Sequence, residues 1–245
     1  MTGYGDTALV RGMQYLAEKQ ASIAHNLANV NSFGFKRQVG YATDGGPEFG
    51  SILDQQLRTV QYSQHTDWTT GSMTSTGDKL NVGLEGAGFL MVRDEAGNQF
   101  YTRDGAMRID TNGFLVDHDG KKYVDANGGP ITFVSTDMDR DKIIISPDGT
   151  IAVSGNPVGQ LGLFTPPDPA SLTAVGNSVF VDRSGATPSP ARGVSMRQGY
   201  LERSNVESLT ELVNMITVQR GFEATGRVLS TLGRIKSAFL NTVGR

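Results

Sequence analysis

The sequence contains no cysteine, only three histidines and a single tryptophan among its 245 residues. The lack of cysteine excludes disulfide bonds, zinc–thiolate sites, iron–sulfur clusters and cysteine nucleophiles. Basic residues do not outnumber acidic ones, since 22 lysines and arginines stand against 25 aspartates and glutamates, a net charge of −3. A protein that binds nucleic acid through bulk charge needs a positive surplus. We therefore expect no nucleic-acid partner.

Long apolar runs are also missing. No stretch approaches the roughly 18 to 20 apolar residues that cross a bilayer. The N-terminal region lacks a basic start followed by an uninterrupted apolar stretch, which is the pattern of a cleaved signal peptide. We therefore expect neither membrane insertion nor a cleaved signal peptide.

Proline is absent from both ends of the chain, because all nine prolines lie between Pro47 and Pro190. Proline is excluded from helix interiors, so the two ends are free to form long helices. The middle is rich in glycine turns that separate short β-rich runs, a pattern typical of antiparallel sheets. The runs include Phe89–Val92, Ile143–Ile145, Ile151–Val153 and Val179–Val181. The sequence therefore predicts an α+β fold, with a helix at each end and a central antiparallel β-rich domain.

Each end carries an apolar seam at helical spacing. The N-terminal seam steps by four and three residues: Leu9, Met13, Leu16, Gln20, Ile23, Leu27 and Val30. The C-terminal end has one stripe of Leu209, Leu212, Val213 and Ile216, and a second stripe of Phe222, Leu229, Leu232, Phe239 and Val243. Such seams predict that the two helices pair as a coiled coil. We predict a helix over 1–36, an extended linker over 37–76, the β-rich domain over 77–197, and a return segment with the second helix over 198–245.

A helix pair of this kind leaves apolar surface uncovered, which usually marks a protein–protein interface. Gly221, Gly226 and Gly233 lie inside the second helix, where each glycine costs about 1 kcal/mol. One explanation is close approach by a neighbouring helix. Packing of the helix on the chain's own β-domain, or simple tolerance of glycine, is the alternative.

The search for catalytic motifs finds little. His118 lies in Asp117-His118-Asp119-Gly120, which reads better as a hairpin turn than as a metal or acid–base site. The segment Gly83–Gly88 has no phosphate-binding lysine and is better explained as a turn between strands. We therefore expect no enzyme activity, no catalytic residue, no metal, no cofactor and no small-molecule substrate. A hydrolase with a scattered carboxylate pair stays open as an alternative.

Four motifs resemble those of bacterial flagellar axial proteins, the rod and hook subunits. The first is Ala24–Lys36, with the residues AHNLANVNSFGFK. The others are Gly86–Leu90 (GAGFL), Tyr101–Gly105 (YTRDG) and Gln198–Val206 (QGYLERSNV), the last running on to Arg220. The motifs keep the family's order and span nearly the whole chain. The chain is thus identified as a member of the flagellar basal-body rod protein family. Its length and the segments Gly128–Ile131 and Ser146–Ile151 most resemble the proximal-rod branch, with the distal-rod branch as the alternative.

The resemblance implies an axial subunit that packs helically around a central export channel. It also implies export through the flagellar apparatus, assembly across the periplasm, and contacts with copies of itself and with other rod proteins. Asn26 and Asn29 would satisfy backbone groups at the helix end, although Asn26 could equally be a surface residue. Phe33 and Phe35 would anchor the turn that leaves the helix, with burial inside the same chain as the alternative. The expected subunit-interface residues are Leu9, Met13, Leu16, Ile23, Asn26, Leu27, Asn29, Phe33, Gly34, Phe35, Leu209, Leu212, Ile216, Phe222, Leu229, Leu232 and Phe239.

A second class of function stays open from the sequence alone. The β-domain could be a secreted glycan-binding module that dimerises through a helical stalk. Trp68, the only tryptophan, falls outside the predicted β-rich domain, which counts against an aromatic platform for sugars.

Overall fold

The computed structural model describes residues 4–44, 60–133, 140–176 and 178–243. The chain divides into two compact units, each assembled from segments that are distant in sequence. Unit 1 consists of Met1–Ala28, Gln38–Asp67 and Glu207–Arg245, and unit 2 consists of Asn29–Arg37 and Trp68–Val206. Each unit therefore contains residues from both halves of the sequence.

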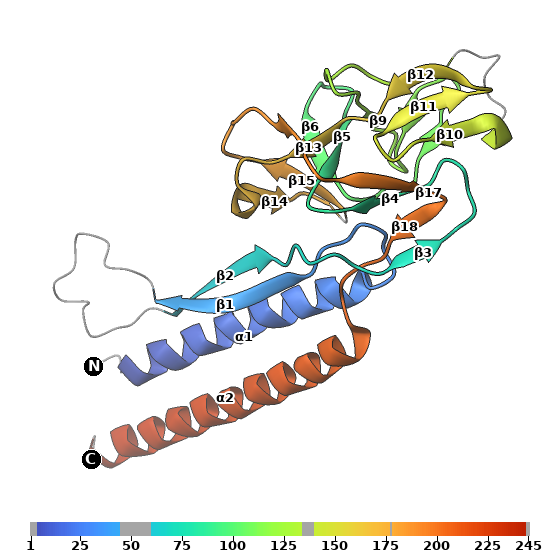
Figure 1. Cartoon of the computed structure of the whole chain (residues 1–245). Coiled ribbons are helices and arrows are strands. Elements are labelled where there is room, and N and C mark those ends of the chain that lie inside the picture. The colour runs from blue at the N-terminus through green and yellow to red at the C-terminus, as the bar shows by residue number, and fades with distance from the viewer. Residues whose placement is uncertain (1–3, 45–59, 134–139, 177, 244–245) are drawn as a thin grey trace. The chain divides into compact units, whose positions relative to one another are not determined.

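Unit 1 holds the two helices and a β-hairpin. Helix α1 (Tyr4–Ala28) lies between the hairpin and helix α2 (Ser208–Val243), and the two helices run antiparallel (Figure 1). Strands β1 (Gln38–Asp44) and β2 (Val60–Thr66) pair antiparallel, with Gln38 opposite Thr66. The predicted helix at each end is confirmed. No helix among the described residues has the length and apolar character that a membrane span requires.

The described residues of unit 2 form short antiparallel strands and 3₁₀ turns. Their bounds, in chain order, are β3 (Met73–Ser75), β4 (Val82–Glu85), β5 (Phe89–Arg93), β6 (Gln99–Thr102), β7 (Arg108–Ile109), β8 (Leu115–Val116), β9 (Lys122–Tyr123), η2 (Arg140–Lys142), β10 (Ile143–Ile145), β11 (Thr150–Val153), β12 (Asn156–Gln160), β13 (Leu163–Thr165), η3 (Pro169–Ser171), β14 (Leu172–Ala174), β15 (Val179–Asp182), β16 (Ser189–Pro190), β17 (Ser195–Gln198) and β18 (Tyr200–Glu202). The predicted central β-rich domain is confirmed.

The strands of unit 2 form one large sheet and several small ones. The large sheet has the order β14-β15-β6-β5-β9-β8-β7, and β13 joins it by pairing with β5 and with β16. Strands β10, β11 and β12 form a three-stranded sheet. The two remaining pairs join distant parts of the chain, since β4 pairs with β17 and β3 pairs with β18. The residues just before α2 are therefore part of the β-unit.

The core of unit 2 has two clusters of buried apolar side chains. The larger contains Leu84, Leu90 and Val92, all inaccessible to solvent. The smaller contains Phe89 and Phe180, and Trp68 packs against both rings, with centroid distances of 5.3 and 4.9 Å. The expectation that Trp68 falls outside the β-region is therefore wrong. It lies inside a packed aromatic cluster.

Several turns of unit 2 share one arrangement, in which each turn has its own aspartate. The carboxylates of Asp94, Asp110, Asp117 and Asp125 each accept a hydrogen bond from the backbone amide four residues later, at 2.7–2.8 Å. The residue before that amide is a glycine with positive φ in every case. This is the local chemistry that aspartate and glycine favour in turns. His118 lies in one of these turns with an exposed ring, so the turn interpretation of this motif is confirmed.

Two boundaries differ from those predicted. Helix α1 ends at Ala28, and Asn29–Arg37 belongs to unit 2 rather than to the helix. The expected linker over 37–76 contains β1, β2 and β3, so it is more regular than an extended connection. The part of this range between 45 and 59 lies outside the described residues.

Candidate assembly interface

The facing sides of α1 and α2 carry part of each predicted seam. A Cβ atom built on Gly221 would stand 3.7 Å from a methyl group of Leu16, and one on Gly226 would stand 4.0 Å from the methyl of Met13. Both are ordinary contact distances, so the space between the helices does not require glycine. A Cβ at Gly233 would meet nothing within 4 Å. Two of the three helix glycines therefore face α1, but a methyl group would fit at each of them, so close approach of α1 in the same chain does not explain these glycines.

Helix α2 buries one side and exposes apolar residues on the opposite side. Glu211 and Val218 are the buried positions, at 1% and 5% exposure. The first predicted stripe lies on the far side and is solvent-accessible: Leu209 69%, Leu212 44%, Val213 55% and Ile216 51%. We call these four residues the outer quartet. The apolar seams predict that Leu209, Leu212 and Ile216 pack against the N-terminal seam both within and between subunits. Within one chain they face away from α1, because Glu211 and Val218 take the inner side of α2, so the contact between subunits stays a prediction.

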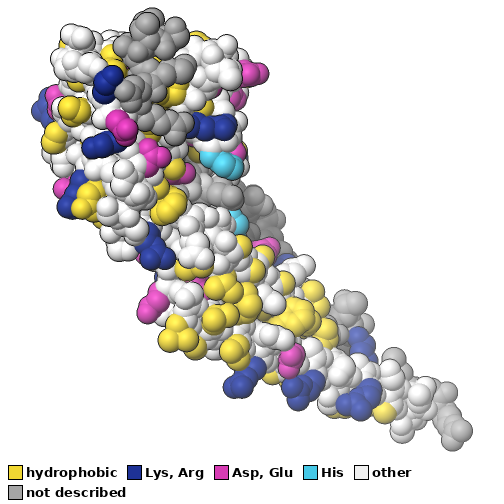
Figure 2. Space-filling model, turned by 90° about the vertical axis from the view of Figure 1, so that its right-hand side faces the viewer, with side chains coloured by type: hydrophobic (Ala, Val, Ile, Leu, Met, Phe, Trp, Pro, Cys, Tyr) yellow, Lys and Arg dark blue, Asp and Glu magenta, His cyan; other side chains and the backbone are white. Residues whose placement is uncertain are grey.

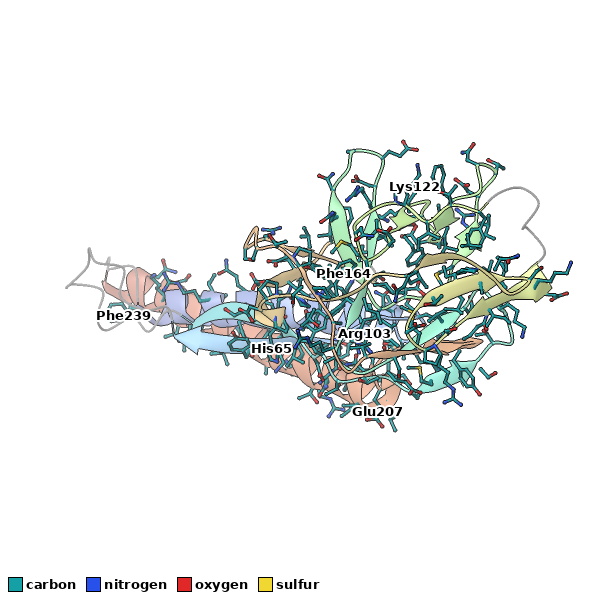
Figure 3. All side chains as sticks on the ribbon, turned by 45° about the horizontal axis from the view of Figure 1, so that its top comes forward. His65, Arg103, Lys122, Phe164, Glu207 and Phe239 are labelled. Atoms are coloured by element: carbon teal, nitrogen blue, oxygen red, sulfur yellow. The ribbon has the colours of Figure 1, made fainter. Side chains whose placement is uncertain are left out.

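Helix α2 also exposes apolar side chains nearer its C-terminus. These are Val228, Leu232, Ile235 and Phe239, with exposures from 38% to 65%. Figure 2 shows hydrophobic side chains gathered on the surface of the helical unit, and Figure 3 labels Phe239 near the end of α2. Uncovered apolar surface on this scale is typical of a contact with another molecule.

The other predicted seam residues are distributed between the interior and the surface of unit 1. Ile23 is buried at 5% exposure. The remaining seam members are half-buried: Leu9, Met13, Leu16, Leu27, Phe222 and Leu229. The side chain of Val243 lies outside the described residues. No contact with another copy is visible in a single chain, so the interface role of these residues stays a prediction.

Asn26 joins α1 to the hairpin. Its side chain is fully buried, and its amide nitrogen donates to the carbonyl oxygen of Gln38 at 2.8 Å. The backbone amide of Gln38 donates back to Asn26 Oδ1 at 2.9 Å, and the hydroxyl of Ser22 donates to the same carbonyl at 3.3 Å. Asn26 therefore satisfies backbone groups of its own chain, as one interpretation expected, and the surface alternative is wrong.

The segment Asn29–Arg37 is held in unit 2 by its backbone. Gly34 has a φ of +66°, and a Cβ atom at this position would collide with the backbone of Arg103 and Asp104. The amide of Gly34 donates to the carbonyl of Glu202 at 2.8 Å. Phe35 is 2% exposed and Asn29 6%, while the carbonyl of Phe33 accepts from the hydroxyl of Ser178 at 2.6 Å. Burial inside the same chain, the alternative for Phe33 and Phe35, therefore holds for Phe35, whereas the side chain of Phe33 is half-buried.

A buried ionic cluster lies at the centre of this segment. Lys36 Nζ donates to Glu202 Oε1 at 2.7 Å, and Arg103 Nε donates to Glu202 Oε2 at 2.7 Å. The side chains are at most 3% exposed. The backbone amide of Gly71 also donates to Glu202 Oε1, at 2.9 Å. We call Lys36, Arg103 and Glu202 the junction triad; Figure 3 labels Arg103 inside the β-unit.

The junction triad brings all four sequence motifs together. Lys36 ends the first motif, Arg103 lies in the third, and Glu202 lies in the fourth. The guanidinium of Arg103 also donates to the carbonyls of Gly86 and Gly88 in the second motif, at 3.0 and 2.7 Å. These charged residues lie within the motifs that the sequence shows, but the sequence did not predict that they form a site. The signal that could have pointed to them is the presence of charged residues inside short motifs rich in glycine.

The backbone of the first motif is also tied to the fourth through Asn205. The amide of Arg37 donates to Asn205 Oδ1 at 2.7 Å. The amide nitrogen of Asn205 donates to the carbonyl of Thr69 at 3.1 Å, and the same carbonyl accepts from Lys36 Nζ at 2.6 Å. The two segments that lead to the terminal helices are therefore fastened to one another.

Comparison with known proteins matches two parts of the chain to related family models. Residues 83–153 match the family described as flagellar hook protein FlgE/F/G D1 domain, and residues 197–241 match the flagellar basal body rod FlgEFG protein C-terminal family. The rod protein FlgG of Buchnera aphidicola subsp. Acyrthosiphon pisum is 32% identical, over 85% of this chain and 88% of that protein. The chain belongs to the flagellar basal-body rod protein family.

Other relatives in this family carry two different names. The rod protein FlgG of Borreliella burgdorferi is 31% identical, over 86% of this chain and 87% of that protein. The rod protein FlgF of Caulobacter vibrioides is 27% identical, over 91% of each chain. The family assignment made from the four motifs is therefore confirmed. Both of its branches are represented among the relatives.

The described residues show no metal centre. No group of three or more histidine, cysteine, aspartate or glutamate side chains among them is placed to hold a metal ion. Within Gly83–Gly88, the first three residues belong to β4 and Gly86–Gly88 connects β4 to β5. The carbonyls of Gly86 and Gly88 bind Arg103. The interpretation as a turn between strands therefore holds for Gly86–Gly88 only.

Proposed function

We propose that the chain is a structural subunit that polymerises through its terminal helices into the hollow, torque-transmitting tube of the flagellar rod. The helices would form an inner coiled-coil domain together with those of neighbouring copies and of other rod proteins. The observation that carries this proposal is the outer quartet of α2, which is exposed in a chain of the rod family. The chain would reach the periplasm through the flagellar export apparatus, without membrane insertion.

The physical basis is the burial of the outer quartet on assembly. Full burial of a leucine, valine or isoleucine contributes about 1.5–3 kcal/mol. The quartet is roughly half exposed, so covering it would contribute on the order of 1 kcal/mol for each residue. A contact that joins different faces of successive copies does not close on itself and produces a filament.

We place the chain in the proximal part of the rod, with the distal part as the alternative. The similarity of Gly128–Ile131 and Ser146–Ile151 to proximal-rod proteins supports this placement. Relatives named FlgF and FlgG both match over most of the chain. An electron micrograph of basal bodies that carry a tagged copy would distinguish the two positions.

The proposed function is tested by Leu212→Asp in cells that lack the native copy. Leu212 is 44% exposed and lies on the face opposite α1, so the charge should leave the fold intact and block assembly. We expect no swimming in soft agar, and no rod in isolated basal bodies. Thr217→Asp is the matched control, because Thr217 is exposed on the same helix beside the quartet. Rods of normal yield with Leu212→Asp would overturn the proposal.

A further inference from the structure

Helix α1 has a third face that neither α2 nor the hairpin covers. Leu16 and Met13 face α2, while Ser22 and Asn26 bind the start of β1. The remaining face carries exposed residues at steps of four and three, most of them alanines: Val10, Gln14, Ala17, Ala21, Ala24 and Ala28. We call these six residues the alanine face. This spacing is the seam of a helix that packs along a second helix.

The alanine face and the outer quartet cannot meet within one copy. The quartet lies on the side of α2 opposite Glu211 and Val218, which are buried. It therefore points away from α1 of the same chain. The alanine face is likewise displaced from the side of α1 that holds Leu16 and Met13. Any contact between the two faces requires a second molecule.

We infer that the outer quartet of one copy packs against the alanine face of a second copy. This inference rests on the proposed function and specifies the partner surface within it. Large side chains on one helix interdigitate best with small side chains on the facing helix. The quartet supplies two leucines, a valine and an isoleucine, and α1 supplies alanines at matching spacing. Because the two faces differ, each added copy leaves one of each face free, and the chain of copies stays open.

Charge selects the direction in which the second helix runs. Glu18 is exposed beside Ala17, and Arg220 is exposed one turn beyond Ile216. Among the residues that the structure describes, neither has an ion-pair partner. In an antiparallel contact that sets Leu209 opposite Ala28, eleven positions along each helix bring Arg220 opposite Ala17. Arg220 then lies beside Glu18, where the opposite charges attract.

A parallel contact cannot keep both features. With Leu209 opposite Ala17, Arg220 meets Ala28 rather than a carboxylate. A parallel register that brings Arg220 to Glu18 instead sets Leu212 opposite Val10 and Ile216 opposite Gln14, so the quartet no longer faces the alanines. The antiparallel contact is therefore the one that matches both side-chain size and charge.

Engineered cysteines test the contact in the full chain, which has no cysteine of its own. In the antiparallel contact Ala28→Cys and Leu209→Cys of neighbouring copies come within the Cα separation of about 4.4–6.8 Å that a disulfide needs. The double variant should therefore give a ladder of disulfide-linked oligomers from isolated rods on a non-reducing gel. Ala17→Cys with Leu209→Cys is the matched control, because eleven helical residues displace that pair by roughly 16 Å.

The outcomes separate this inference from the proposed function. Cross-linking of the Ala17→Cys pair instead would overturn the antiparallel contact in favour of the parallel one. Intact rods that cross-link with neither pair would overturn the contact while the proposed function stands. Failure of the cysteine-free chain to enter any rod would overturn both.

A charge-reversal cycle provides a second measurement that needs no oxidation. Glu18→Arg and Arg220→Glu should each lower the yield of assembled rods about two- to fivefold, the range expected of an exposed ion pair. The double variant restores opposite charges and should recover the yield of the native chain. If the double variant instead gives a lower yield of assembled rods than either single variant, the two side chains do not meet.

Discussion

Replacement of Glu202 by glutamine should destabilise unit 2 far more than its small change in shape suggests. Glu202 is 1% exposed and receives the charges of Lys36 and Arg103. Glutamine keeps one acceptor oxygen but replaces the other with an amide group that cannot accept a hydrogen bond. Both cations would then stay buried without their carboxylate.

The size of the effect follows from the burial of the pair. Breaking a buried ion pair by removing one partner costs about 3–5 kcal/mol. A domain of roughly 150 residues loses about 2–4 °C in melting temperature for each kcal/mol. The melting temperature of unit 2 should therefore fall by about 6–20 °C. Since total stabilities are about 5–15 kcal/mol, the variant should come close to unfolding.

The assay uses the single tryptophan of the chain. Trp68 packs against Phe89 and Phe180 in unit 2, so its fluorescence follows the unfolding of that unit during heating. Glu85→Gln is the matched control, because Glu85 pairs with Arg197 at 3.6 Å with both side chains about half exposed. Exposed pairs contribute about 0–1 kcal/mol. If Glu202→Gln lowers the melting temperature no more than Glu85→Gln does, the argument from buried charge is refuted.

Two further predictions concern the assembly of unit 2 and its response to pH. Deletion from Leu209 onward should leave unit 2 folded but unable to join a rod. Deletion from Gln198 onward also removes Glu202 and should abolish the cooperative unfolding transition that Trp68 fluorescence reports. Equal unfolding transitions in both truncations would contradict the role of the junction triad. Burial raises the pKa of Asp104 from 3.8 to about 6, so its folded form holds a proton that the unfolded form has released. The free energy of unfolding should fall as pH rises from about 4 to about 6, by up to about 3 kcal/mol from this group. Asp104→Asn should therefore match the native chain near pH 4 and exceed it in stability near pH 7.5 in urea titrations, and an equal stability at both pH values would contradict the assignment.

The fold class followed from local patterns. Proline-free ends with apolar seams predicted α1 and α2, because a long helix needs both an uninterrupted backbone and an apolar side. Glycine turns between short apolar runs predicted the strands β5, β10, β11 and β15. Trp68 was misplaced because nothing local marks a residue that precedes β3 as part of an aromatic cluster.

The candidate site could be predicted only in part. The apolar stripe of Leu209, Leu212 and Ile216 was evident, but its direction was not, since periodicity shows that a face exists and not what covers it. Glu211 and Val218 took the inner side of α2 instead. The junction triad was equally hidden, because 166 positions separate Lys36 from Glu202.

The sequence alone thus determined which segments become helix, strand and turn, and which family the chain belongs to. Those properties depend on neighbours within a few positions of each other, where spacing, turn residues and motifs are legible. The tertiary structure decided that Asn29–Arg37 and Gln198–Val206 meet at Glu202, and which side of α2 faces water. Both outcomes depend on burial and charge between residues far apart in the chain, and these arise only when the distant segments come together.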